Sequence, residues 1–179
     1  AAEGERSVVM EIGPGFGGGP VTYRRAFGDK VVVVVVDLPE SLLLSSSHIR
    51  GTYPDARIWM YDPRVASDFP EDWTEVDFIL LPNYRSDLIS RLPYLNYVVN
   101  CISMQEMRAE DIEEYCQRIK ERLDGVFFSM NLDRHDDNPE LESLSDILAR
   151  HFFLLPKPAT YETQKWNKAR RYIASVDPD

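Results

Sequence analysis

The sequence predicts a three-layer α/β fold, in which helices cover both faces of a mostly parallel β-sheet. Short apolar runs without a polar face, such as residues 7–12 and 31–36, are typical of strands buried in a parallel sheet. Segments with a helical spacing of apolar residues lie between these runs, and strands that alternate with helices imply parallel pairing. The last two expected strands have no helix between them, so we expect an antiparallel strand near the C-terminus.

Strands and helices are expected to alternate along most of the chain. The strands are expected at residues 7–12, 30–36, 57–61, 77–81, 97–102, 125–130, 151–155 and 171–176. The helices are expected at residues 17–27, 39–53, 87–92, 110–123 and 140–150. In the 110–123 helix, Ile112, Cys116 and Ile119 recur at helical spacing, whereas Glu114 and Arg118 are expected to face outward.

The composition indicates a single domain over residues 1–179, a length sufficient to bury a substantial core. The net charge of −10 argues against a nucleic-acid partner, because sequence-independent binding of nucleic acid requires a basic face. The longest apolar run, residues 31–36, is too short to cross a bilayer, so no membrane partner is expected. Cys101 and Cys116 fall in apolar segments and are expected to be reduced thiols, which favours a cytoplasmic protein.

A glycine-rich turn follows the first expected strand. Gly13, Gly15 and Gly17 come directly after Glu11 and Ile12. Glycine allows a tight turn and lets the backbone approach a ligand closely. If a helix follows, its free N–H groups point toward whatever binds in the turn. The turn therefore predicts a site for a nucleotide-containing cofactor.

Two cofactors fit this turn. The spacing of Gly13, Gly15 and Gly18 matches the dinucleotide fingerprint, with Asp37 near the offset of a ribose-binding acid. The same turn, preceded by Glu11, also matches the acid-x-Gly-x-Gly-x-Gly first motif of class I S-adenosylmethionine-dependent methyltransferases. In both families an acid after the second strand accepts hydrogen bonds from ribose hydroxyls. The acid before the glycines favours S-adenosylmethionine, because that cofactor carries an ammonium group for a carboxylate to bind.

Three further segments accompany the turn: Asp37-Leu38-Pro39-Glu40, Leu81-Pro82-Asn83, and Asn100 to Met107. Together with the glycine turn they resemble the sugar O-methyltransferase family, and the likeness runs from about Val8 to Asn131. The resemblance implies a Rossmann-like class I methyltransferase fold that binds S-adenosylmethionine across the carboxyl ends of its strands. It also implies O-methylation of a sugar or of a glycosylated small molecule.

The resemblance, together with the acid before the turn, assigns a role to each part of the cofactor site. The glycines should wrap the methionine moiety, Asp37 should hold the ribose, and Leu38 should pack on the adenine. The tip of the 77–81 strand should lie near the adenine edge, and Asn100 and Ser103 should face the transferring methyl group. The expected cofactor-binding residues are Glu11, Gly13, Gly15, Gly17, Asp37, Leu38, Leu81, Pro82, Asn83, Asn100 and Ser103.

Glu106 and His135 are the candidate catalytic residues. Transfer of a methyl group from a sulfonium to a hydroxyl is an in-line displacement, so positioning supplies much of the acceleration. A general base helps because an alcohol is a poor nucleophile until its proton is leaving. The acidic residues around His135, at 133, 136 and 137, could also hold a divalent metal of the magnesium type. A solvated acidic loop is the favoured interpretation of this segment, so no metal ligand is assigned.

Two other functions stay open on the sequence alone. One is an NAD(P)-dependent Rossmann oxidoreductase that uses the match to the dinucleotide fingerprint. The other is a non-catalytic Rossmann-like module of a larger assembly, because methyltransferases of this kind usually carry a helical region before the first strand that is missing here. The expected partner is a small sugar-like acceptor, and the chain is compatible with a homo-oligomer or with a longer parent chain.

Overall fold

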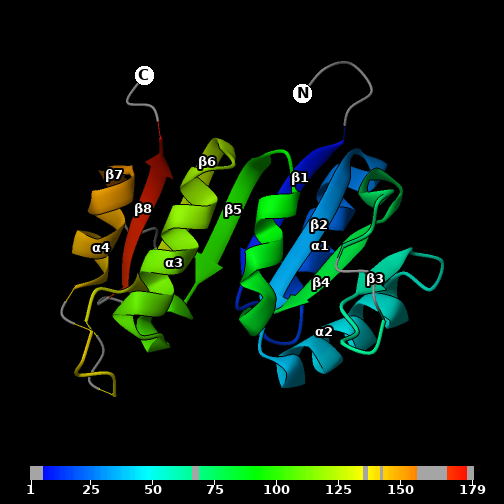
Figure 1. The fold of residues 1–179 in the computed structure, drawn as a ribbon, viewed down its shortest axis with the longest axis horizontal. Coiled ribbons are helices and arrows are strands. Elements are labelled where there is room, and N and C mark those ends of the chain that lie inside the picture. The colour runs from blue at the N-terminus through cyan, green and yellow to red at the C-terminus, as the bar shows by residue number, and fades with distance from the viewer. Residues whose placement is uncertain (1–5, 66–68, 135–136, 142, 157–168, 177–179) are drawn as a thin grey trace.

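The computed structural model describes residues 6–65, 69–134, 137–141, 143–156 and 169–176, and they form an eight-stranded sheet flanked by helices (Figure 1). The strand order across the sheet is β3-β4-β2-β1-β5-β6-β8-β7. The strands are β1 (Ser7–Ile12), β2 (Val31–Asp37), β3 (Ile58–Met60), β4 (Phe78–Pro82), β5 (Leu95–Cys101), β6 (Leu123–Leu132), β7 (Phe153–Pro156) and β8 (Ala169–Ser175).

The pairing confirms a mostly parallel sheet with one antiparallel strand near the C-terminus. From β3 to β6 every neighbouring pair is parallel. Strand β8 runs antiparallel to both of its neighbours, β6 and β7. Because the parallel strands all point the same way, their carboxyl ends meet along one edge of the sheet, where open α/β sheets bind ligands.

The helices cover the two faces of the sheet. The α-helices are α1 (Gly18–Phe27), α2 (Pro39–Thr52), α3 (Ala109–Lys120) and α4 (Leu144–His151). The 3-10 helices are η1 (Gly28–Lys30), η2 (Trp73–Glu75), η3 (Asn83–Arg91) and η4 (Met104–Glu106). Figure 1 shows α3 and α4 in front of the sheet and α1 behind it. None of the helices in the described ranges is long and apolar enough to cross a membrane.

Strand β2 explains why the sheet has two cores. Its six valines alternate between the faces, and all are at most 3% exposed. Val33 and Val35 belong to the core beneath α1 and α2, whereas Val32, Val34 and Val36 belong to the core beneath η3, α3 and α4. A strand that is apolar on both faces must be central, as the sequence predicted.

The main departures from the expected elements have local causes. The helix expected at 87–92 is the 3-10 helix η3, which begins earlier and has non-helical backbone at Arg85. The helix expected from residue 140 begins at Leu144, because the Ser143 hydroxyl accepts the Asp146 N–H and caps it there. Leu123 opens β6 and pairs with Leu95 instead of ending α3; it is buried either way, so apolar spacing could not distinguish the two.

Candidate functional site

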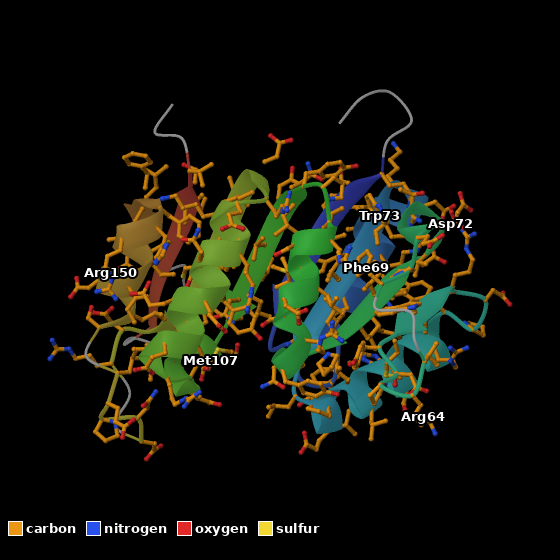
Figure 2. The ribbon with its side chains drawn as sticks, in the orientation of Figure 1. Arg64, Phe69, Asp72, Trp73, Met107 and Arg150 are labelled. Carbon is orange, nitrogen blue, oxygen red and sulfur yellow. The ribbon has the colours of Figure 1, made fainter. Side chains whose placement is uncertain are left out.

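A cavity of about 850 Å³ lies at the carboxyl ends of β1, β2, β4 and β5. Its volume is within the range of small-molecule sites. One wall is formed by the glycine turn and the end of β2, and the other by η3, η4 and α3. The lining residues are Ile12, Gly13, Gly15, Val36, Asp37, Leu38, Ser41, Asn83, Tyr84, Ser86, Asp87, Ile102, Ser103, Glu106, Met107, Arg108, Asp111, Glu114, Tyr115 and Arg118. Figure 2 shows Met107 beside the start of α3.

The glycine turn needs glycine for both conformation and space. Gly13 has a φ of +71° and Gly17 a φ of +88°, a region that L side chains rarely adopt. The Gly13 N–H donates to the Val36 carbonyl at 2.8 Å, which ties the turn to β2. A Cβ at Gly13 would lie 2.2 Å from the Ser103 Oγ. The loop after β5 therefore packs directly on the bare backbone of the turn.

The carboxylate of Asp37 lies where the turn meets the end of β2. Its Oδ2 accepts the Gly15 N–H at 2.8 Å, and its Oδ1 accepts the Leu38 N–H at 2.7 Å. A carboxylate has about four acceptor positions, so these bonds leave capacity for hydroxyl donors from the cavity. Asp37 thus both organises the turn and presents acceptors to a ligand.

Asn100 and Asn131 build a buried amide network behind the opposite wall. Asn100 is fully buried; its Nδ2 donates to the Ile12 carbonyl at 2.9 Å, and its Oδ1 accepts the Asn131 Nδ2 at 2.8 Å. The Asn131 Oδ1 in turn accepts the Ser103 N–H at 3.2 Å. The network fixes the position of Ser103, whose hydroxyl also donates to the Ile12 carbonyl at 3.1 Å. Asn100 therefore acts on the cavity wall through Ser103.

Ile102 directly follows the end of β5 and has a strained backbone conformation. Its φ is +57°, and a positive φ is an outlier for a β-branched residue. Its N–H donates to the Met130 carbonyl at 2.8 Å, which holds it in this conformation. Such strain costs on the order of 1–3 kcal/mol and clusters at functional sites. For this reason the strand expected at residues 97–102 stops one residue early. Nothing in the sequence pattern predicts the positive φ of Ile102.

Glu11 lies on the opposite face of β1 from the cavity residue Ile12. It is 6% exposed, and a Cβ at Gly19 would lie 2.0 Å from its Oε2. The Tyr23 hydroxyl hydrogen-bonds to the carboxylate, but the buried Oε2 has no hydrogen-bond partner. Burial raises the pKa of Glu11 to about 7, the Tyr23 hydrogen bond opposes this, and the nearby charge of Asp37 adds to it. Its expected contact with an ammonium group stays a prediction.

The structure brings most of the predicted site residues together, but not all of them. Those in the cavity wall are Gly13, Gly15, Asp37, Leu38, Asn83, Ser103 and Glu106. Those outside the wall are Glu11, Gly17, Leu81, Pro82 and Asn100. His135 lies outside the described residues. Within the described ranges, no group of three or more His, Cys, Asp or Glu side chains could hold a metal ion.

Sequence reasoning missed the part of the wall that η3 and α3 contribute. Arg118, expected to face outward, is half-buried and donates a hydrogen bond to the Ser86 hydroxyl. Burial raises the pKa of Tyr115 in the same wall to about 12. Tyr84, which is 59% exposed, lines the cavity beside Asn83. In the sequence, the position of Tyr84 just after the end of a strand was the one indication that this segment lies near the site. The groove between η3 and α3 forms only when two distant segments meet in the folded chain, so the sequence pattern did not predict it.

Comparisons by sequence found no relative. No protein-family model matches the chain, and no curated protein matches it either.

Solved structures share the fold. A complex of LepI with SAM matches 97% of the chain at 12% identity with a TM-score of 0.59. An O-methyltransferase family protein from Burkholderia thailandensis matches 94% of the chain at 10% identity with a TM-score of 0.61. A precorrin-6y C5,15-methyltransferase from Geobacter metallireducens matches 97% of the chain at 13% identity with a TM-score of 0.61. The chain spans 43%, 50% and 81% of those three proteins, respectively. It therefore has the Rossmann-like α/β fold of methyltransferases, as the sequence predicted.

Proposed function

We propose that this chain binds S-adenosylmethionine and transfers its methyl group to a hydroxyl of a sugar or glycosylated small molecule. One observation carries the proposal: the carboxylate of Asp37 and the bare backbone of Gly13 and Gly15 line the same cavity at the carboxyl edge of the sheet. A ribose supplies two vicinal hydroxyl donors for such a carboxylate. At Gly15 nothing lies within 4 Å of where a Cβ would be, so the backbone of the turn is open to close approach by a ligand there.

Residues of both walls would hold this cofactor. Asp37 would accept the ribose hydroxyls, and Leu38, which is 54% exposed, would offer an apolar surface to the adenine. Asn83 and Tyr84 would border the adenine edge. The cofactor itself would supply an electrophilic methyl group on a sulfonium.

The protein's contribution to the chemistry would come from the opposite wall. Ser103, held by the amide network, would help orient the reacting groups, and in-line geometry can supply much of the acceleration. The Glu106 carboxylate is exposed at the cavity wall, where it could accept the proton of an acceptor hydroxyl.

The polarity of the wall from η3 and α3 supports a hydroxyl-rich acceptor. Asp87, Asp111, Glu114 and Arg118 offer both hydrogen-bond acceptors and donors there. Each hydroxyl of a sugar can both donate and accept a hydrogen bond. A wall of mixed charge therefore suits a sugar as the methyl acceptor better than it suits an apolar molecule.

Because the fold alone does not define the reaction, the test must separate binding from turnover. Another solved structure that shares the fold is described as a pericyclic reaction enzyme. The first experiment is a thermal melt with S-adenosylhomocysteine, with NAD⁺ and with neither. A ligand at about 100 times its Kd adds roughly 2.7 kcal/mol of stability, a shift of several degrees for a domain of this size.

A shift with S-adenosylhomocysteine but not with NAD⁺ supports the cofactor, and the reverse contradicts it. Asp37→Ala should abolish the shift. Asp37→Asn is the matched variant, since its amide oxygen can still accept the Gly15 N–H and only the bond from the Leu38 N–H loses its acceptor. Formation of S-adenosylhomocysteine from S-adenosylmethionine with a panel of glycosides then tests the acceptor class; turnover only with amines or thiols would contradict a hydroxyl acceptor.

A further inference from the structure

The 3-10 helix η4, which carries Glu106, is too short to hold its own position. Its internal hydrogen bonds run from the Glu106 N–H to the Ser103 carbonyl at 3.1 Å and from the Met107 N–H to the Met104 carbonyl at 3.0 Å. A helix of a single turn is unstable by itself, because forming it fixes several backbone angles for each hydrogen bond gained. The position of η4, and with it that of the Glu106 carboxylate, therefore depends on bonds from other parts of the chain.

Gln105 anchors the buried side of η4 to the end of β6. It is 3% exposed, and its Oε1 accepts the Leu132 N–H at 2.7 Å. Met104 is fully buried in the core. Glu106, in contrast, is exposed at the cavity wall. Two of the three residues of η4 thus serve as anchors, and the third lines the cavity.

Asn138, in the segment between β6 and α4, binds the other end of η4. Its Nδ2 donates to the Gln105 carbonyl at 3.0 Å and to the Met107 carbonyl at 2.8 Å. The last carbonyls of a helix have no partner within the helix, so this amide group caps η4 from a distant part of the chain. Both acceptors are carbonyl oxygens, and among uncharged side chains only an amide nitrogen carries two N–H donors for them.

The segment that carries Asn138 is itself fixed. The Asn138 carbonyl accepts the N–H of Leu141 at 3.2 Å, and Leu141 is 3% exposed in the core. Before this segment, the Asp133 carbonyl accepts the Leu144 N–H at 2.9 Å, which ties the end of β6 to the start of α4. The amide of Asn138 therefore acts on η4 from an anchored position.

We propose that Asn138 is a positioning residue that fixes the Glu106 carboxylate at the cavity wall. This rests on the function proposed above, in which Glu106 accepts the proton of the acceptor hydroxyl. The two carbonyls that Asn138 binds, those of Gln105 and Met107, lie on either side of Glu106 along the chain, so a shift of the Glu106 backbone would strain both bonds. Asn138 is outside the cavity lining and acts through Glu106. A misplacement of about 1 Å can lower a rate by about 10²-fold.

The test is a double-mutant cycle of Asn138→Ala and Glu106→Gln, with turnover followed by transfer of a labelled methyl group. Asn138→Ala should lower kcat by about 10–100-fold, with the thermal shift by S-adenosylhomocysteine unchanged. In the Glu106→Gln background the same change should lower turnover by less than about two-fold, because the group that Asn138 positions is already lost. A purely structural role would lower turnover by the same factor in both backgrounds and would overturn the proposal.

Two further variants separate positioning from stability. Asn138→Asp has the same shape but no N–H donor, so it should lose at least as much turnover as Asn138→Ala. Asn96→Ala is the matched control: the Asn96 Oδ1 accepts the Val8 N–H at 2.8 Å at the amino end of the sheet, away from the cavity. It should lose stability but keep its kcat. A similar fall of kcat in Asn96→Ala would contradict a specific role for Asn138.

Amide hydrogen exchange tests the contact with η4 without any acceptor. Exchange of the Glu106 and Met107 N–H groups should become faster by about ten-fold or more in Asn138→Ala, but not in Asn96→Ala. Unchanged exchange would overturn the proposal even if turnover falls. If the wild-type chain methylates no hydroxyl compound, the function proposed above fails and the role of Asn138 in the reaction fails with it. Faster exchange would then still show that Asn138 holds η4.

Discussion

The two walls of the cavity are built in different ways. At the ends of β1 and β2 the wall is made of backbone, with glycines at positive φ and a carboxylate that binds the N–H of Gly15. At the ends of β5 and β6 the opposite wall is held in place by side chains that meet across long stretches of sequence, as Asn100 and Asn131 do behind Ser103. If the proposed function holds, the first wall binds the cofactor and the second positions the reaction. Changes in the first should therefore alter ligand affinity, and changes in the second should alter turnover.

The largest effect is expected from Glu106→Gln. Loss of a general base typically lowers the rate by 10²–10⁴-fold, while the thermal shift with S-adenosylhomocysteine should stay unchanged. Turnover and melts measured on the same preparation give both values. Glu110→Gln, a change of an exposed acid at the start of α3 outside the cavity wall, is the control. Equal loss in both variants would contradict a specific role for Glu106.

Gly13→Ala tests the backbone wall. The left-handed φ costs about 1–2 kcal/mol for an alanine, and the Cβ would also meet the side chain of Ser103, so we expect about 3 kcal/mol of destabilisation in chemical denaturation. Gly28→Ala is the matched control, because Gly28 has a φ of +59° but nothing within 4 Å of a Cβ. The free energy of unfolding of Gly28→Ala should fall by only about 1 kcal/mol. Equal losses would mean that the contact with Ser103 carries no energy.

Glu11 predicts a pH dependence of stability. Its pKa is about 7 in the folded chain against 4.5 for the ordinary group, so the folded state binds more protons between these values. The free energy of unfolding should therefore fall as the pH rises from about 4.5 to about 7, by roughly 3 kcal/mol. Glu11→Gln should flatten this part of the profile in urea denaturation series. A profile of Glu11→Gln that keeps the full slope would assign the dependence to other groups.

Asn131→Ala tests the side-chain wall. It removes the acceptor of the Ser103 N–H and the donor to Asn100, and it leaves buried polar groups unpaired. Such groups cost about 1–3 kcal/mol, so we expect about 2 kcal/mol of destabilisation together with lower turnover. Unchanged turnover at reduced stability would show that the network supports the fold without positioning the reaction.

Ile102→Gly should have the smallest effect on stability. It relieves the positive φ but removes a half-buried side chain, so the two contributions nearly cancel and the net change should be within about 1 kcal/mol. Denaturation curves measure the balance. A loss of turnover without a loss of stability would assign the Ile102 side chain to the reaction; a loss of about 3 kcal/mol or more would show that no strain is stored there.

The difference between the two walls also explains what the sequence could predict. Strand β1 and the glycine turn are local: an apolar run, three glycines and the acid Asp37 are sufficient to place them. The partners of Asn100 are not local, since Ile12 and Asn131 reach it only through the folded sheet. The prediction that Arg118 faces outward was wrong for the same reason. On an isolated helix its side chain would face solvent, but in the folded chain η3 lies beside α3 and Arg118 lines the cavity.

Strand β2 has a consequence for how the chain reaches its fold. A run of six valines without charge or proline is a segment of high aggregation propensity when exposed. In the native sheet β1 and β4 occupy both of its edges, and cores cover both of its faces. Because β4 lies far along the chain, one edge stays open until that strand arrives. The refolding yield of this protein should therefore fall steeply with concentration, with β2 as the segment through which unfolded chains associate.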